Sequence, residues 1–175
     1  MRVLVVVDMQ NDFITGSLGT PEAVAIVPNV KKKIAEAVEN DDLIIFTRDT
    51  HFDLYLESKE GQKLPVEHCI RDTDGWQIYP DLIPAGYKNV YILNKYTFGS
   101  KELPKAIEGI VGCDQVELVG LCTDICVVSN ALMLKAHLYN THDISVDANC
   151  CAGVTPASHE AALKTMEMCQ INVKR

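Results

Sequence analysis

The sequence has no long hydrophobic run and no concentrated positive charge. No apolar stretch among its 175 residues approaches the length of about 20 residues that crosses a bilayer, so a membrane-spanning protein is not expected. The 16 lysines and arginines are outnumbered by 24 acidic residues, which gives a net charge of −8. The longest basic run is Lys31–Lys33. Nucleic-acid binding through a phosphate-contacting face is therefore unexpected.

Secretion signals, repeats and linkers are missing as well. A strand pattern at 3–7 opens the chain without the cleavage region of a signal peptide. The seven cysteines are an odd number, and without a secretion signal they predict reduced thiols and a cytoplasmic protein. With 47% hydrophobic and 23% charged residues and no internal repeat, we expect 1–175 to form a single globular domain.

Runs rich in valine and isoleucine alternate with segments of helical spacing. The runs lie at 3–7, 43–47, 90–93, 116–119, 144–146 and 171–173, and helical spacing marks 26–38, 103–110, 127–136 and 161–168. Continuous apolar strands are typical of a parallel sheet covered by helices on both faces. The pattern predicts an α/β fold with an open, doubly wound, mostly parallel six-stranded sheet. The least periodic region, 50–86, is expected to be a long functional loop.

Chemically useful side chains follow four of these strands. In such folds ligands bind beyond the carboxyl ends of the strands, near the point where the strand order reverses. Asp8 follows the first strand, Asp49 and His51 the second, Lys95 the third and Cys126 the fourth. We therefore expect a carboxylate, an Asp-x-His pair, a lysine and a cysteine to converge on one edge of the sheet.

Cys126 stands where the fourth strand ends and a helix begins. The unpaired N–H groups and positive dipole of a helix start favour a thiolate and offer donors to an oxyanion. A nucleophilic cysteine is one interpretation; a small cysteine packed under a helix is the other. Asp8 ends an apolar strand, so burial raises its pKa while a nearby Lys95 lowers it, as a base working near neutral pH requires. Asp8 as a turn cap and Lys95 as a solvated surface residue remain the alternatives.

Asp49, His51 and His68 offer one carboxylate and two imidazoles for a metal. This set suits Zn²⁺, with Fe²⁺ and Mn²⁺ as alternatives. Glu60 in the intervening loop is a candidate fourth ligand, and Glu57 is nearly as well placed.

The motifs together resemble those of the isochorismatase-like cysteine hydrolases, and of their nicotinamidase-like branch in particular. They are Asp8-Met-Gln-Asn-Asp-Phe13, Thr47-Arg-Asp-Thr-His51, Leu64-Pro-Val-Glu-His68-Cys69, Lys95 and Gly120-Leu-Cys-Thr-Asp-Ile-Cys126-Val. The resemblance spans essentially the whole chain and implies the isochorismatase-like hydrolase fold. The loop after His51 departs from the branch because it lacks the proline or additional histidine often found there.

The resemblance implies a catalytic triad of Asp8, Lys95 and Cys126, and a metal bound by Asp49, His51 and His68 that holds a pyridine nitrogen. It further implies a cis peptide at Leu121–Cys122 and an oxyanion hole made by the amides of Cys122 and Cys126. A homo-oligomer acting on a small-molecule amide is also implied.

The expected reaction is hydrolysis of nicotinamide, or of a similar aromatic carboxamide, through a thioester. Phe13 and Phe98 are candidates to sandwich the ring, and Trp76 to shape the pocket mouth, although each could instead be a packing residue. The alternatives are another amide or carbamoyl substrate, a redox or metal-binding thiol protein using Cys122 and Cys126, and a non-catalytic binding protein.

Overall fold

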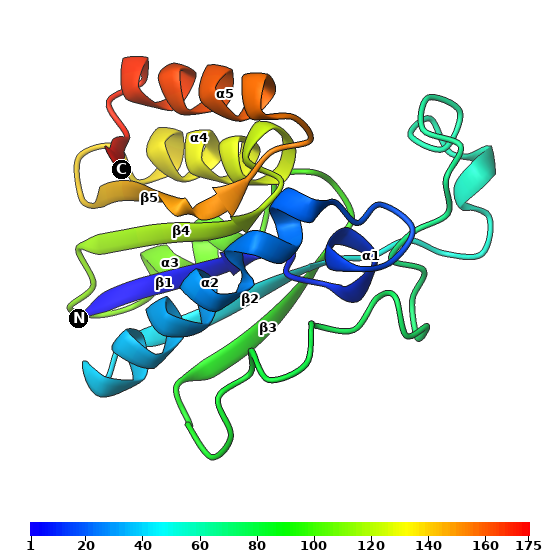
Figure 1. Cartoon of the computed structure of the whole chain (residues 1–175). Helices are drawn as coiled ribbons and strands as arrows, with labels where there is room; N and C mark the ends of the chain where they lie inside the picture. Colours follow the sequence, from blue (N-terminus) through cyan, green and yellow to red (C-terminus); the bar gives the residue numbers. More distant parts are fainter.

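The computed structural model describes all 175 residues and has a six-stranded parallel sheet at its centre (Figure 1). The strands are β1 (Arg2–Val7), β2 (Leu43–Asp49), β3 (Val90–Lys95), β4 (Gln115–Leu121), β5 (Asp143–Ala152) and β6 (Asn172–Lys174). Their order is β3-β2-β1-β4-β5-β6, so the direction of winding reverses between β1 and β4. The predicted doubly wound α/β fold is confirmed, and all five strand pairings are parallel rather than most of them.

Helices cover both faces of this sheet. They are α1 (Asn11–Ile14), α2 (Pro21–Glu39), α3 (Leu103–Glu108), the π-helix Thr123–Val127, α4 (Val128–His137) and α5 (Pro156–Met168), with a short 3₁₀ turn at Tyr55–Glu57. Alternate residues of β1 enter two separate cores because successive strand side chains point to opposite faces. Val3, Val5 and Val7 pack with α3, α4 and α5, whereas Leu4 and Val6 pack with α2.

Helix α2 begins five residues before the predicted segment 26–38. The Thr20 side chain accepts a hydrogen bond from the Ala23 amide, and Pro21 occupies the first turn, where its missing N–H is no loss. The apolar spacing located the buried face of the helix, but the capping residues determine its start. None of the helices is long and apolar enough to cross a membrane.

Strands β2 and β3 extend further than predicted, to Asp49 and Lys95. These two residues were expected in the loops that follow the strands, but the parallel ladder continues and pairs them directly. On the other side of β1, Gly120 of β4 lies in close contact with the Val7 backbone and has φ +117°. A side chain at position 120 would collide with the Val7 carbonyl, so glycine permits β1 and β4 to approach.

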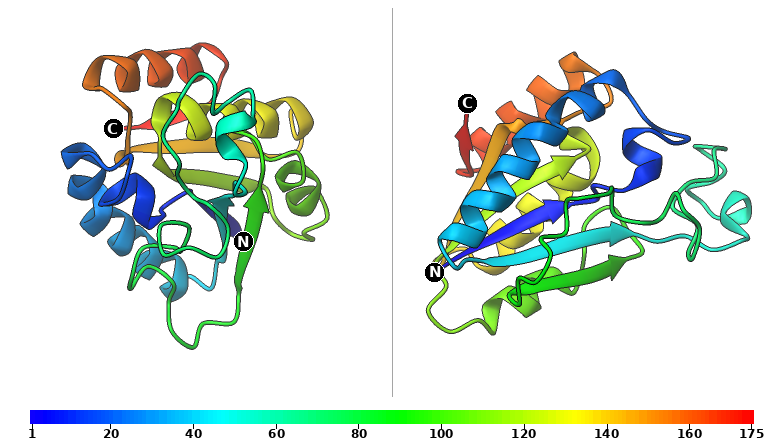
Figure 2. Two further views of the ribbon diagram at one scale, coloured as in Figure 1. Left: turned by 90° about the vertical axis from the view of Figure 1, so that its right-hand side faces the viewer. Right: turned by 60° about the horizontal axis from the view of Figure 1, so that its bottom comes forward.

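The predicted long loop occupies the carboxyl end of the sheet. Figure 2 shows residues 52–67, here called the projecting loop, extending beyond the tips of the strands. The following segment returns along the sheet, where Ile78 and Leu82 pack into the core beneath α2. Both chain termini lie at the opposite end of the strands (Figure 1).

Candidate active site

The Lys95 ammonium is the centre of a buried cluster at the carboxyl ends of the strands. Its Nζ lies 2.7 Å from Asp8 Oδ2, 3.0 Å from Asp49 Oδ1 and 3.5 Å from Cys126 Sγ. The side chains of Lys95 and Asp8 have no exposed surface, and Cys126 is 5% exposed. The expected convergence of Asp8, Lys95 and Cys126 is therefore present in the structure, with Asp49 joined to the same ammonium.

Sheet register explains why these residues meet. Asp49 and Lys95 are direct partners on β2 and β3, and Asp8 follows β1, which pairs with β2 on the other side. Thr47 of β2 fixes Asp8, because its hydroxyl donates to Asp8 Oδ1 at 2.7 Å and its carbonyl accepts from the Asp8 amide at 3.2 Å. Cys126 comes from the far side of the winding reversal, directly after β4.

Cys126 lies inside the π-helix rather than at the first turn of an α-helix. The Leu121–Cys122 peptide that precedes this helix is cis, as the resemblance implied. The Cys122 carbonyl accepts from the amides of Ile125 and Val127. Asn130 of α4 donates to the Cys126 carbonyl at 2.8 Å, which fixes the backbone that carries the sulfur.

Charge and burial set the resting protonation of the cluster. Burial raises the pKa of the Asp8 carboxyl, and the Lys95 ammonium only partly opposes that effect. Burial alone lowers the pKa of Lys95, but Asp8, Cys126 and Asp49 outweigh it and hold the pKa well above its ordinary value.

The protonation state of Cys126 differs from the expectation. Burial raises the pKa of the Cys126 thiol well above its ordinary value, and Asp8 adds to this rise while Lys95 opposes it. The predicted preference for a resting thiolate is therefore wrong, because desolvation outweighs the helix start. A thiol in this state would act as a nucleophile only with a base to accept its proton.

Four side chains beside this cluster form a candidate metal centre. One ligand atom from each of Asp49, His51, Glu60 and His68 lies within 4.8 Å of the others. His51 Nε2 is 3.0 Å from Asp49 Oδ2 and 3.6 Å from Glu60 Oε1, while His68 Nε2 is 3.8 Å from both carboxylates. The His68 Nδ1 lies 2.8 Å from the Val66 carbonyl, which leaves Nε2 directed at the cluster. Two imidazoles and two carboxylates fit a divalent metal ion such as zinc, and Glu60 rather than Glu57 is the fourth member of the group.

Sequence reasoning missed three residues that support this centre. Gln10, fully buried, donates to the Asp49 carbonyl at 2.9 Å and accepts from its amide at 2.7 Å. Asp12 accepts from the Cys69 amide at 2.8 Å and thereby fixes the backbone next to His68. The Tyr55 ring packs edge-on against both histidines, with centroids 4.7 and 5.0 Å away. Gln10 and Asp12 lie in the quoted Asp8–Phe13 motif, but only coordinates reveal what they contact.

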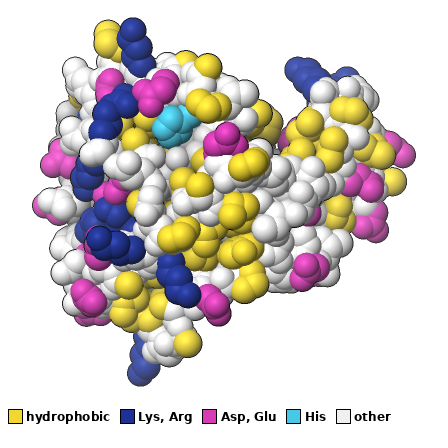
Figure 3. Space-filling model, in the orientation of Figure 1, with side chains coloured by type: hydrophobic (Ala, Val, Ile, Leu, Met, Phe, Trp, Pro, Cys, Tyr) yellow, Lys and Arg dark blue, Asp and Glu magenta, His cyan; other side chains and the backbone are white.

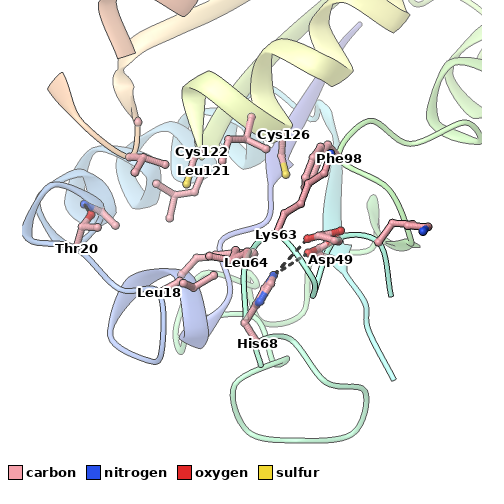
Figure 4. A pocket seen from close by; sticks show the side chains of 17 residues that line it. Leu18, Thr20, Asp49, Lys63, Leu64, His68, Phe98, Leu121, Cys122 and Cys126 are labelled. Atoms are coloured by element: carbon pink, nitrogen blue, oxygen red, sulfur yellow. Dashed lines mark hydrogen bonds and ion pairs between the residues drawn. The ribbon is translucent and has the colours of Figure 1, made fainter. Parts of the chain in front are cut away.

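A cavity of about 490 Å³ opens onto both groups (Figure 4). In Figure 3 the corresponding hollow separates the body of the molecule from the projecting loop. Asp49, His68, Cys122 and Cys126 lie on its wall. Apolar side chains form most of the remaining lining: Phe13, Leu18, Ala23, Leu64, Phe98, Leu121, Ile125 and Val154.

Phe13 and Phe98 line this cavity, whereas Trp76 is outside the lining. The Trp76 indole N–H donates to the Thr50 hydroxyl at 2.9 Å, and the Arg48 guanidinium lies 3.3 Å above the ring. Trp76 is 6% exposed and faces Thr50 instead of the cavity. These contacts favour the packing alternative for Trp76.

Proteins of known activity share this architecture. A nicotinamidase/pyrazinamidase of Mycobacterium tuberculosis is 26% identical, and the match covers 99% of this chain and 98% of that protein. A pyrazinamidase of Pyrococcus horikoshii, solved in complex with zinc, is 29% identical with a TM-score of 0.86, covering 99% and 98% of the two chains. The N-carbamoylsarcosine amidase of Thermoplasma acidophilum is 27% identical with a TM-score of 0.81, covering 99% and 95%.

A family model described as the isochorismatase domain matches residues 2–174. That match takes in every strand and helix that positions the cluster around Lys95 and the candidate metal centre. The chain belongs to the isochorismatase domain family and is a nicotinamidase-like hydrolase of that family.

Proposed function

We propose that this protein is a metal-containing cysteine amidase that hydrolyses nicotinamide, or a similar small aromatic carboxamide, to the acid and ammonia. The observation that carries the proposal is the position of Lys95 Nζ, within 3.5 Å of Asp8, Asp49 and Cys126 at once. One buried cation thereby joins a base and a sulfur nucleophile to a ligand of the candidate metal centre. A structural cysteine has no need of such neighbours.

In the first half of the reaction Asp8 accepts the proton of the Cys126 thiol, and the sulfur attacks the carboxamide carbon. The raised pKa of Asp8 suits a base that works near neutral pH. Because Lys95 remains a cation throughout, it stabilises the negative charge that is shared between carboxylate and sulfur. The tetrahedral oxyanion accepts hydrogen bonds from the backbone amides of Cys122 and Cys126, each worth roughly 3–4 kcal/mol in comparable enzymes.

The intermediate then collapses as its C–N bond breaks. Asp8 returns the proton to the departing nitrogen, ammonia leaves, and an acyl thioester remains on Cys126. In the second half Asp8 accepts a proton from water, and the resulting hydroxide attacks the thioester carbon. The C–S bond breaks, the acid is released and the proton returns to sulfur, so that the enzyme ends as it began.

The metal centre positions the substrate in this proposal. Asp49, His51, Glu60 and His68 would hold a divalent ion, zinc being favoured by the nitrogen and oxygen donors and by the zinc-containing relative from Pyrococcus horikoshii. Such an ion supplies a Lewis-acidic contact for a ring nitrogen. Phe13 and Phe98 on the cavity wall would pack against the faces of the ring.

Ammonia release from zinc-loaded protein tests the proposal. We expect turnover of nicotinamide and pyrazinamide, with loss of at least about a thousandfold in Cys126→Ala, the size of effect seen when a nucleophile is removed elsewhere. Chelation followed by zinc should remove and restore the activity. Cys169→Ala is the matched control, since Cys169 is the exposed thiol and should be dispensable. Turnover that survives Cys126→Ala rejects the mechanism.

A second substrate class is supported by the likeness to N-carbamoylsarcosine amidase. The same cluster around Lys95 could act on another small amide or on a carbamoyl compound. The discriminating result is selective turnover of carbamoyl or aliphatic amides, unaffected by chelation, with no turnover of nicotinamide.

A further inference from the structure

One turn of the projecting loop places two lysines on the cavity wall beside the candidate metal centre. Residues 58–64 form this turn, because the Gln62 amide donates to the Ser58 carbonyl and the Leu64 amide to the Glu60 carbonyl. Four-residue spacing on a helical turn brings Lys59 and Lys63 to the same side. Both line the cavity together with Glu60 and Leu64 of the same turn.

The two carboxylates in the cavity lining contact other side chains, so the ammonium groups of Lys59 and Lys63 have no acidic partner. Asp49 is bound by Lys95, and Glu60 lies 3.6 and 3.8 Å from His51 and His68. Neither Lys59 nor Lys63 takes part in any of the chain's ion pairs, although the protein carries 24 acidic residues. Adjacent like charges on one turn repel each other. An anion in the cavity would relieve that repulsion.

The cavity also has room for more than one small ring. At about 490 Å³ it falls within the range of roughly 300–1,000 Å³ that encloses drug-sized ligands. Figure 4 shows Lys63 and Leu64 on the wall, with Cys126 above them and Leu18 and Thr20 to one side. A carboxamide held at Cys126 therefore leaves volume for a substituent, and Lys59 and Lys63 are part of the wall around that volume.

We infer that Lys59 and Lys63 are specificity-determining residues for carboxamides that carry a second, anionic group. This inference rests on the proposed amidase function and narrows its substrate class. A carboxylate or a phosphate on the ring satisfies the same chemistry, since both accept hydrogen bonds from ammonium groups. The lysines act in binding and not in bond making, so they lower KM without changing kcat.

The test compares three carboxamides that share a free pyridine nitrogen, each assayed with zinc-loaded protein. They are nicotinamide, 5-carbamoylnicotinic acid and 5-acetylnicotinamide, whose methyl ketone replaces the carboxylate and removes its charge. We expect kcat/KM at least tenfold higher for the acid than for the ketone. In the Lys59→Gln/Lys63→Gln double variant this preference should vanish through KM alone. Lys164→Gln, an exposed lysine on α5, is the matched control and should retain the preference.

Binding to the Cys126→Ala protein, measured by calorimetry, gives a second readout that needs no turnover. The acid should bind more tightly than the ketone, and added salt should reduce the difference because exposed charges are screened. A 5-phosphonomethyl nicotinamide in the same panel separates phosphate-like from carboxylate recognition. Preference for either anion supports the inference.

Failure of this inference and failure of the proposed amidase function give different results. Equal turnover and binding of the acid and the ketone, or a preference that survives the double variant, overturns the inference and leaves the amidase function intact. Zinc-loaded protein that hydrolyses no carboxamide overturns both.

Discussion

Replacing Lys95 with methionine should damage both folding and catalysis. Methionine keeps much of the length and volume of the side chain but removes its charge. The substitution leaves Asp8 and Asp49, 0% and 4% exposed at their side chains, without the cation that compensates them. Removing one partner of a buried ion pair destabilises proteins by roughly 3–5 kcal/mol, because the remaining charge cannot be solvated.

For a chain of this size that loss corresponds to a fall in melting temperature of roughly 6–20 °C. It is a large share of the 5–15 kcal/mol that typically separates folded from unfolded domains. Urea unfolding and thermal melts measure the effect, and ammonia release measures the accompanying loss of activity. Lys31→Met is the control: its ion pair with Asp81 is exposed at both ends and should contribute at most about 1 kcal/mol.

The direction of the pH dependence gives a second check on the same variant. Burial already raises the pKa of Asp8 in the folded protein, and loss of Lys95 should raise it further. When a carboxyl has a higher pKa in the folded than in the unfolded protein, the protein becomes less stable as pH rises from the unfolded pKa through the folded pKa. The destabilisation by Lys95→Met should therefore be larger at pH 8 than at pH 5. A variant with wild-type stability at both values would refute the assignment of Lys95 as a compensating buried cation.

Three further predictions concern the surroundings of this lysine. Because burial raises the pKa of the Cys126 thiol, its alkylation by iodoacetamide should be slow at pH 7 and increase steadily to pH 9 and beyond; a plateau by pH 7, seen by peptide mass spectrometry, contradicts this. Zinc titrations should show weaker affinity for His68→Ala than for Glu60→Gln, since Glu60 is 24% exposed and His68 only 2%; the reverse order is inconsistent with the assigned centre. Gln10→Leu should lower the free energy of unfolding by at least about 2 kcal/mol, because the buried Asp49 amide and carbonyl lose their partners; unchanged urea melts would show that Gln10 is dispensable.

The fold and the main site residues could be predicted because local patterns determine them. Apolar runs located all six strands, and their carboxyl ends identified Asp8, Lys95 and Cys126 as neighbours before any coordinates. Parallel topology alone places those ends on one edge of the sheet. The spacing of Asp49, His51 and His68 likewise indicated a ligand set that the structure brings together.

Other features depend on contacts between distant segments. The extension of β2 to Asp49 follows from pairing with Lys95, 46 residues later, and no local pattern reports that register. The thiol state of Cys126 depends on burial beside Asp8, which outweighs the helix start that the sequence reveals. The choice between the two roles considered for Trp76 depends on such contacts as well, because Thr50 and Arg48, which are distant in the sequence, hold its indole in a packed position.

Partitioning of the acyl group between water and hydroxylamine tests the central claim most directly. If Cys126 carries a thioester, nicotinamide and methyl nicotinate form the same acyl-enzyme, so both must give the same ratio of hydroxamate to acid at a fixed hydroxylamine concentration. Different ratios from the two substrates, or acid formation without any hydroxamate, would contradict covalent catalysis at this cysteine.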